Sequence, residues 1–136
     1  MIKSIIKDQF FLKIKSVDAT IEDKEVIQNL KDTLKAHKKE CVGMAANMIG
    51  VNKNIIAIQE KNLYVMINPV IKERFGLPYD TEEGCLSLKG MRTTKRYNKI
   101  TITYLDENFR PKTKTAVGFE AQIIQHEIDH LNGIII

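Results

Sequence analysis

Apolar side chains early in the chain recur at the spacing of a helix. Thr20 and Asp23 resemble a capping box, and the apolar positions after them return every three or four residues. This pattern predicts a helix over about residues 21–39, with Leu30 and Leu34 facing the core. The basic residues within this helix are most simply its solvated face, rather than a contact with nucleic acid or the ribosome.

Beyond this helix the pattern changes to short β-prone runs. Residues 54–59 and 63–68 predict a hairpin, after which Pro69 allows an edge strand to continue and argues against a central one. Residues 75–83 contain glycine, proline and aspartate and predict a loop. Residues 99–105 alternate apolar and polar side chains, which predicts a half-buried strand that turns into another extended piece.

A second helical pattern spans residues 118–131, and Gly133 stands where a helix stop belongs. Its apolar stripe consists of Ile124, Ile128 and Leu131. Together with the extended runs, this helix predicts an α+β fold in which antiparallel or mixed β-sheets pack around a central helix. We expect one domain over residues 1–136, because the sequence shows no repeat and no linker.

The composition is that of an ordinary soluble globular protein, with 43% hydrophobic residues, 28% charged residues and a net charge of +4. No apolar run is long enough to cross a bilayer, and the first residues lack the features of a secretory signal. We therefore expect a cytoplasmic protein in which Cys41 and Cys85 are thiols rather than a disulfide.

The late helix carries the strongest chemical signal, the sequence H-E-I-D-H at residues 126–130, which matches H-E-x-x-H. His126 and His130 lie one turn apart on one face, so both imidazoles can reach a single metal ion. Glu127 is placed about 100° around the helix from His126, near enough to take a proton from a water on that ion. His37 has no such partner and is expected on the surface.

A catalytic metal site of this type needs a third protein ligand. No side chain of a suitable type follows Leu131, which disfavours a zinc endopeptidase and points to a ligand from upstream. The candidates are Cys41, Cys85, Glu82 and Glu83. A thiolate is the stronger ligand for a borderline metal, but periodicity does not choose between the two cysteines.

Three segments of the chain resemble, in order, the three signature motifs of the peptide deformylase family. Residues 41–50, CVGMAANMIG, resemble the first motif, G-φ-G-φ-A-A-x-Q-φ-G, where φ is apolar. Residues 83–87, EGCLS, match the second motif, and residues 125–130, QHEIDH, match the third, Q-H-E-x-D-H. The order and approximate spacing also agree, so the resemblance spans nearly the whole chain.

This resemblance implies a peptide deformylase-like fold and a hydrolase that removes the N-formyl group from formyl-methionine of nascent bacterial proteins. It implies one divalent metal ion held by Cys85, His126 and His130, with Fe²⁺ in the cell and Zn²⁺, Ni²⁺ or Co²⁺ as substitutes. Glu127 would take the proton of the attacking water and return it to the leaving amine. The backbone N–H of Leu86 would stabilise the oxyanion.

The resemblance also implies a substrate site, formed by Val42, Gly43, Met44, Gly84, Arg92 and Ile123. The substrate would be the N-formyl-methionyl peptide of a nascent chain, bound as an added strand. We expect a monomer that makes at most a transient contact with the ribosome and has no DNA or membrane partner.

The chain departs from the first motif at two positions. Met48 stands where the family has a glutamine that donates to the oxyanion, and a thioether cannot donate. Asn47 could replace that amide only if the backbone shifted by one residue. Cys41 replaces the first glycine, which is tolerated if its φ is negative. The alternative function is a deformylase-like metal-binding protein with little turnover, although a purely structural metal site would not need Glu127.

Overall fold

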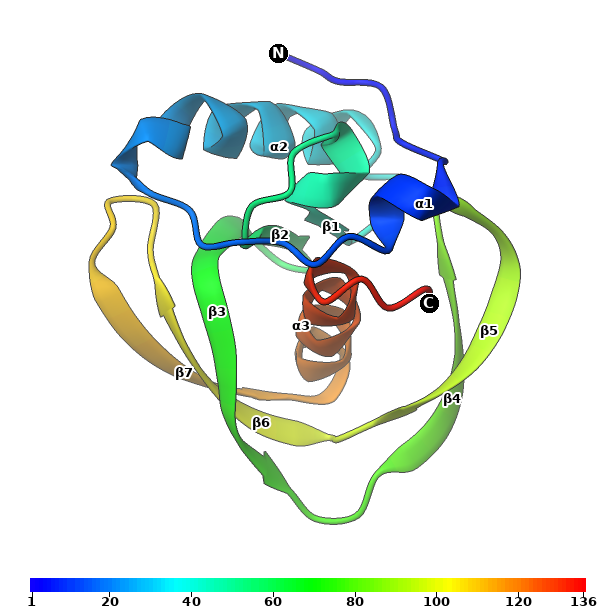
Figure 1. Ribbon diagram of the computed structural model, residues 1–136. Helices are drawn as coiled ribbons and strands as arrows, with labels where there is room; N and C mark the ends of the chain where they lie inside the picture. Colours follow the sequence, from blue (N-terminus) through cyan, green and yellow to red (C-terminus); the bar gives the residue numbers. More distant parts are fainter.

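The computed structural model describes residues 1–136 as one α+β unit (Figure 1). Its elements, in chain order, are α1 (Gln9–Leu12), η1 (Ile21–Asp23), α2 (Lys24–Ala36), β1 (Gly43–Ala45), η2 (Ala46–Ile49), β2 (Ile55–Gln59), β3 (Leu63–Phe75), β4 (Tyr79–Cys85), β5 (Leu88–Arg96), β6 (Lys99–Leu105), β7 (Pro111–Val117) and α3 (Gly118–Leu131).

The strands form two antiparallel sheets. One has five strands in the order β1-β2-β3-β6-β7, and the other consists of β4 and β5 alone. Figure 1 shows α3 in the middle of the molecule, with β4 and β5 on one side and α2 lying across β1 and β2. The predicted α+β fold with sheets around a central helix is confirmed.

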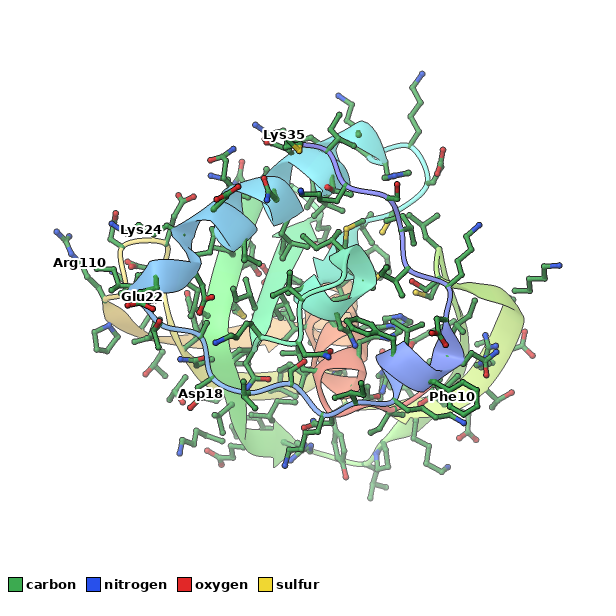
Figure 2. The ribbon with its side chains drawn as sticks, turned by 45° about the horizontal axis from the view of Figure 1, so that its top comes forward. Phe10, Asp18, Glu22, Lys24, Lys35 and Arg110 are labelled. Atoms are coloured by element: carbon green, nitrogen blue, oxygen red, sulfur yellow. The ribbon has the colours of Figure 1, made fainter.

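The first predicted helix is present as η1 followed by α2. Thr20 and Asp23 form the expected capping box: the Thr20 hydroxyl accepts from the N–H of Glu22, and the Asp23 carboxylate accepts from the N–H of Thr20. Leu30 and Leu34 are fully buried, as predicted. The α-helix ends at Ala36, which is earlier than expected, and the next residue no longer has helical geometry. Lys24 and Lys35 of α2 are exposed to solvent (Figure 2), whereas Lys31 pairs with Glu107.

The predicted hairpin is formed by β2 and β3, but the edge position expected for the strand that contains Pro69 is wrong. β3 is the central strand of the five-stranded sheet. Its register with β6 shifts between Ile67 and Val70, and Asn68 adopts a φ of 51°. Pro69 therefore lies in a β-bulge, where the ladder does not require its missing N–H.

The loop predicted for residues 75–83 is also wrong. Phe75 ends β3, and after a short turn β4 begins at Tyr79 and pairs with β5 from Tyr79↔Arg96 to Cys85↔Leu88. Burial alternates along β4, but its buried position is the charged residue Glu83. Burial along β4 therefore has the period of two of a strand. The sequence does not show this period, because the buried position is not apolar.

The late helix has the predicted bounds and the predicted stop. Its apolar stripe is buried in a core shared with the five-stranded sheet and α2. Gly133 has a φ of 75°, and a β-carbon there would lie 2.3 Å from the carbonyl oxygen of Lys13. Only glycine suits this close approach to the segment after α1.

None of the helices has the length and apolar character that crossing a membrane requires.

Candidate metal centre and active site

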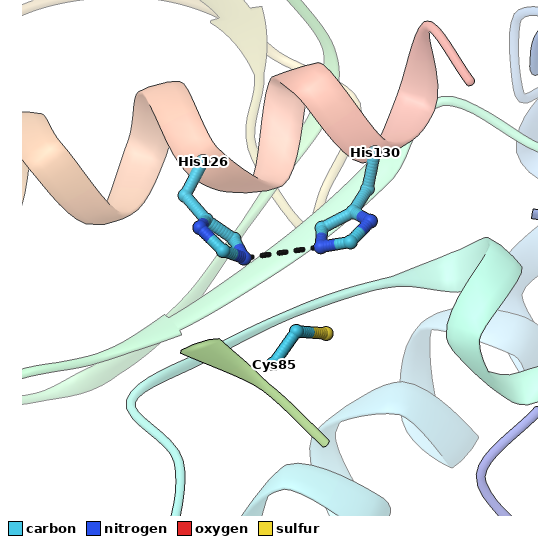
Figure 3. A group of neighbouring side chains, drawn as sticks. All are labelled: Cys85, His126 and His130. Atoms are coloured by element: carbon cyan, nitrogen blue, oxygen red, sulfur yellow. Dashed lines mark hydrogen bonds between the residues drawn. The ribbon is translucent and has the colours of Figure 1, made fainter. Parts of the chain in front are cut away.

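Three potential ligands converge between β4 and α3 (Figure 3). Cys85 is the last residue of β4, and His126 and His130 lie one turn apart on α3. Their donor atoms all lie within 4.8 Å of one another. The two Nε2 atoms of the histidines face each other at 3.0 Å, and both rings are buried. The structure thus brings together the cysteine and histidines that the resemblance implied.

The two imidazoles compete for one positive charge. Burial lowers the pKa of His130 to about 3, and the neighbouring charge of His126 acts in the same direction. Burial also opposes a charge on His126, but hydrogen bonds to Cys85 and Glu83 outweigh it and raise the pKa of His126 to about 10. Two ring nitrogens aimed at one point beside a thiol are a donor set that a divalent ion fits, since Cys and His are the ligands of borderline metals.

Glu83, one of the four ligand candidates, is not part of the donor group but contacts His126. Its Oε1 lies 2.8 Å from Nδ1 of His126, and both its oxygens accept from the guanidinium of Arg96, at 2.7 and 3.0 Å. Burial would raise the pKa of Glu83, but bonds from His126, Arg96 and Gln122 outweigh it and lower this pKa to about 2. A carboxylate on Nδ1 orients the ring and leaves Nε2 as the atom that can bind a metal.

The other two candidates lie outside the donor group. Glu82 is exposed on β4. Cys41 lies on the cavity wall, where its thiol donates to the carbonyl of Gly43 at 2.7 Å. Both cysteines are free thiols, as expected. Cys41 does not have a positive φ, so a β-carbon is tolerated at the first glycine position of the motif.

Glu127 lies beside the donor group with a free carboxylate oxygen. The residue is 5% exposed, and its Oε1 has no hydrogen-bond partner. Burial raises the pKa of Glu127 to about 7. A buried carboxyl group that other side chains leave unpaired can exchange protons with a water or a reacting amide.

A cavity of about 600 Å³ opens over these groups. Nine of the twelve assigned site residues line it: Val42, Gly43, Met48, Gly84, Cys85, Leu86, Ile123, His126 and Glu127. Met44 does not line it and is fully buried in the hydrophobic core. Arg92 does not line it either and donates instead to the carbonyl of Lys89.

Asn47 and Met48 point in different directions. Nδ2 of Asn47 donates to the backbone oxygen of His130 at 2.9 Å, and this side chain is fully buried. The one-residue shift that would turn its amide into the cavity is absent. Met48 lines the cavity, and its Sδ accepts a long hydrogen bond of 3.5 Å from the N–H of Ala45.

Comparison with known proteins agrees with this geometry. The polypeptide deformylase family model matches residues 2–136. The chain belongs to the polypeptide deformylase family. A peptide deformylase from Clostridium beijerinckii is 58% identical over 139 residues, and the match covers 100% of each chain. The assignment as a hydrolase of this family, made from the motifs, is confirmed.

Two solved structures confirm the fold. A peptide deformylase from Synechococcus elongatus in complex with actinonin has a TM-score of 0.85 and 33% identity, covering 98% of this chain and 74% of that one. A class I type b peptide deformylase from Acinetobacter baumannii with bound Met-Ala-Ser has a TM-score of 0.88 and 26% identity, covering 99% and 97%. Peptide deformylases are metalloenzymes, which agrees with the Cys85–His126–His130 group.

Several residues of the deformylase cavity were missed by sequence reasoning. Phe119, Gln122, Leu88 and Met91 line it, and Arg96 supports Glu83 from outside the cavity. Phe119 and Gln122 could have been found from the helix itself, because both lie one or two turns before His126. Arg96 gave no such signal, since it is one of three basic residues within a short charged run.

Proposed function

We propose that this chain removes the formyl group from N-terminal formyl-methionine of nascent peptides. The observation that carries the proposal is the unpaired carboxylate of Glu127 beside the Cys85–His126–His130 donor group, at the base of a cavity of about 600 Å³. A cavity of this size is sufficient for a methionine side chain and the next residues of an extended peptide.

Glu127 serves as the general base and then the general acid. It accepts a proton from the attacking water through its free Oε1 and returns the proton to the amine as the formyl C–N bond breaks. Its pKa of about 7, raised by burial, lets the same group do both at neutral pH. The wall formed by Gly43 and Ile123 holds its side chain in place.

The donor group would hold one divalent ion through Sγ of Cys85 and Nε2 of His126 and His130. When bound, such an ion supplies Lewis-acid chemistry, which lowers the pKa of water and polarises the formyl oxygen. We propose Fe²⁺ as the ion in the cell, with Zn²⁺, Ni²⁺ and Co²⁺ as substitutes.

The peptide enters between the edges of the two sheets. β1 is an edge strand of the five-stranded sheet, and its Gly43 lines the cavity opposite Gly84 of β4. Two free strand edges facing one cleft suit a peptide that binds as an added strand. The solved relative with bound Met-Ala-Ser supports a ligand of this kind. The first side chain would rest on Ile123, while Arg92 acts at most at the rim.

The oxyanion has fewer donors here than the first motif normally provides. The N–H of Leu86 lies at the cavity wall and can donate, whereas Met48 cannot and Asn47 is turned toward His130. Losing one oxyanion donor costs about 10²–10³ in rate in a well-studied hydrolase. We therefore propose an active but slower deformylase. The alternative with little turnover rests on the missing donor at Met48 alone, and the presence of every proposed ligand and of the base argues against it.

All donor groups come from one chain, which supports a monomer as the working unit. Formyl-methionine is made during bacterial translation, so the proposal implies that the protein acts in the cytoplasm, close to the ribosome. The exposed lysines of α2 lie away from the cavity and are not needed for it.

The direct test is deformylation of formyl-Met-Ala-Ser by protein purified anaerobically and loaded with Fe²⁺. We expect release of formate and a free amine, and loss of this activity in Glu127→Gln, which preserves the size of the side chain. Glu107→Gln, on the surface between β6 and β7, is the matched control and should keep full activity. No formate from folded, metal-loaded wild type would refute the proposal.

A further inference from the structure

The proposed metal ligands come from two parts of the fold that share no backbone hydrogen bonds. Cys85 belongs to the two-stranded sheet, whereas His126 and His130 belong to α3, which packs on the five-stranded sheet. The distance between the thiol and the imidazoles therefore depends on the side chains that join β4 and β5 to α3.

Two buried side chains make these connections: Glu83, which is hydrogen-bonded to Gln122 and His126 of α3, and Arg96, which holds Glu83 and also reaches α3 itself. Arg96 is the last residue of β5 and is 3% exposed. Its Nε and Nη2 donate to the two oxygens of Glu83 on β4, at 3.0 and 2.7 Å. Its Nη1 donates to Oδ2 of Asp129 on α3, at 2.7 Å. One planar guanidinium thus binds both strands of the small sheet to the helix through charge-assisted hydrogen bonds.

Both carboxylates that Arg96 holds adjoin metal ligands. Glu83 is two residues before Cys85, and its Oε1 also contacts Nδ1 of His126 at 2.8 Å. Asp129 immediately precedes His130. Arg96 itself does not line the cavity, so it has no route to the substrate. Apart from a bond of 3.3 Å from Nη1 to the backbone oxygen of Lys95, its hydrogen bonds lead to the two carboxylates beside the ligands.

We infer that Arg96 is a positioning residue that fixes the strand of Cys85 against the helix of His126 and His130, and thereby sets the affinity and geometry of the metal centre. The inference rests on the proposed function only in assuming that these three residues bind a divalent ion. Lysine cannot take this role, because a single ammonium lacks the planar fork that spans two carboxylates.

Arg96→Met tests the inference, because methionine keeps much of the length and removes the three bonds to Glu83 and Asp129 together with the weaker bond to Lys95. The protein is loaded with Co²⁺, its dissociation constant is measured by competition with a chelator, and its absorption spectrum reports the geometry around the ion. We expect the dissociation constant to rise about 10- to 100-fold, the size of effect seen when residues that hold metal ligands are changed. The ligand-field bands should shift as well.

Thr33→Val is the matched control for a general loss of stability. Thr33 is fully buried in α2, and its hydroxyl donates to the backbone oxygen of Asn29 at 2.8 Å, with no contact to the metal centre. This variant should melt at a lower temperature than wild type with an unchanged Co²⁺ spectrum and affinity. Equal loss of affinity in Thr33→Val would overturn the inference.

Asp129→Asn covers the case in which Arg96→Met does not fold. It leaves the pair between Arg96 and Glu83 in place and removes only the negative charge of Asp129. We expect a severalfold rise in the dissociation constant and a smaller spectral shift. Unchanged affinity and spectrum in the folded variants of Arg96 or Asp129 would overturn the inference alone, whereas a wild type that binds no Co²⁺ would overturn the proposed function.

Discussion

The backbone of Gly43 lies directly against the carboxyl group of Glu127. A β-carbon built on Gly43 would lie 2.9 Å from Oε2 of Glu127 and 2.6 Å from Cγ2 of Ile123. Strand β1, which forms one wall of the cleft, thus lies so close to the proposed base that no space remains for a side chain at residue 43. The glycine at this motif position has a steric reason in this chain.

Gly43→Ala should therefore displace Glu127. We expect kcat/KM to fall about 10²-fold, since a shift of about 1 Å in a catalytic group has effects of that order. Crowding should also lower the free energy of unfolding by about 1–3 kcal/mol. Steady-state kinetics and urea denaturation measure the two effects. Gly84→Ala is the comparison for stability, because there the nearest atom is the flexible Met91 Sδ. Wild-type kinetics for Gly43→Ala would contradict the steric argument.

Met48→Gln should raise the rate of deformylation. The Gln oxygen can replace Sδ as the acceptor for the N–H of Ala45, which leaves its amide NH₂ free to donate into the cavity. We expect an increase in kcat of about 10- to 100-fold, somewhat less than the full effect of an oxyanion donor. Met48→Leu, which adds no donor, is the control. A rate equal to wild type for both variants would place the oxyanion out of reach of residue 48.

Removing the metal should lower the thermal stability of the wild type. A ligand present at about 100 times its dissociation constant stabilises the folded state by about 2.7 kcal/mol, so a chelator in excess should abolish a gain of this order. Differential scanning calorimetry with and without chelator measures the change. Cys85→Ser removes the thiolate from the donor group and should respond far less. An equal response in Cys85→Ser would mean that the stabilising ion binds elsewhere.

Asn68 should be the most sensitive position of the bulge in β3. Its Oδ1 accepts from the N–H of Ala19, its Nδ2 donates to the carbonyl of Ala19, and its φ is 51°. Asn68→Ala loses both bonds and keeps the strained backbone, for a cost of about 2–4 kcal/mol. Asn68→Gly loses only the bonds and should be about 1 kcal/mol more stable than Asn68→Ala. Chemical denaturation decides the order, and the reverse order would contradict this account.

Asp106 should make stability depend on pH in the acidic range. Hydrogen bonds from the backbone N–H groups of Arg110 and Asn108 hold its pKa below the usual value. A carboxylate with a lowered folded-state pKa stabilises the fold above its unfolded pKa of about 3.9 and loses this effect as pH falls through the folded value. Asp106→Asn should therefore be less stable than wild type at pH 7, with the difference shrinking below about pH 4. Urea titrations at pH 7 and 3 measure it, and a constant difference would contradict the assignment.

The two long helices, α2 and α3, could be predicted from sequence because their burial follows apolar periodicity, whereas the short α1 and the 3₁₀ turn η2 were not predicted. α3 has both an apolar stripe and a glycine stop, and its bounds were predicted correctly. The small sheet could not be predicted in this way. Its buried positions include Glu83 and Arg96, whose charges compensate each other only once the two strands are paired. Burial of a charged residue that depends on an ion-pair partner elsewhere in the chain cannot be predicted from the local pattern of apolar and polar residues.

Like the fold, the candidate site could be predicted from sequence only in part. His126, His130 and Glu127 follow from helical spacing alone, whereas Cys85 needed the resemblance to a family. The prediction that the strand containing Pro69 lies at a sheet edge was wrong. Proline is excluded from central strands only where the hydrogen-bond ladder is regular, and the bulge at Asn68 interrupts the ladder of β3. The burial of Met44 could have been foreseen from strand alternation next to Gly43, had β1 been recognised.

Strand β1 is only three residues long and passes at Ala46 into a 3₁₀ turn. A chain paired with β1 runs out of partners on that edge after about three residues. The cleft would therefore act on the tip of a polypeptide, whatever residues come after that tip. One small enzyme could in this way process products of unrelated sequence while most of each chain is still unmade.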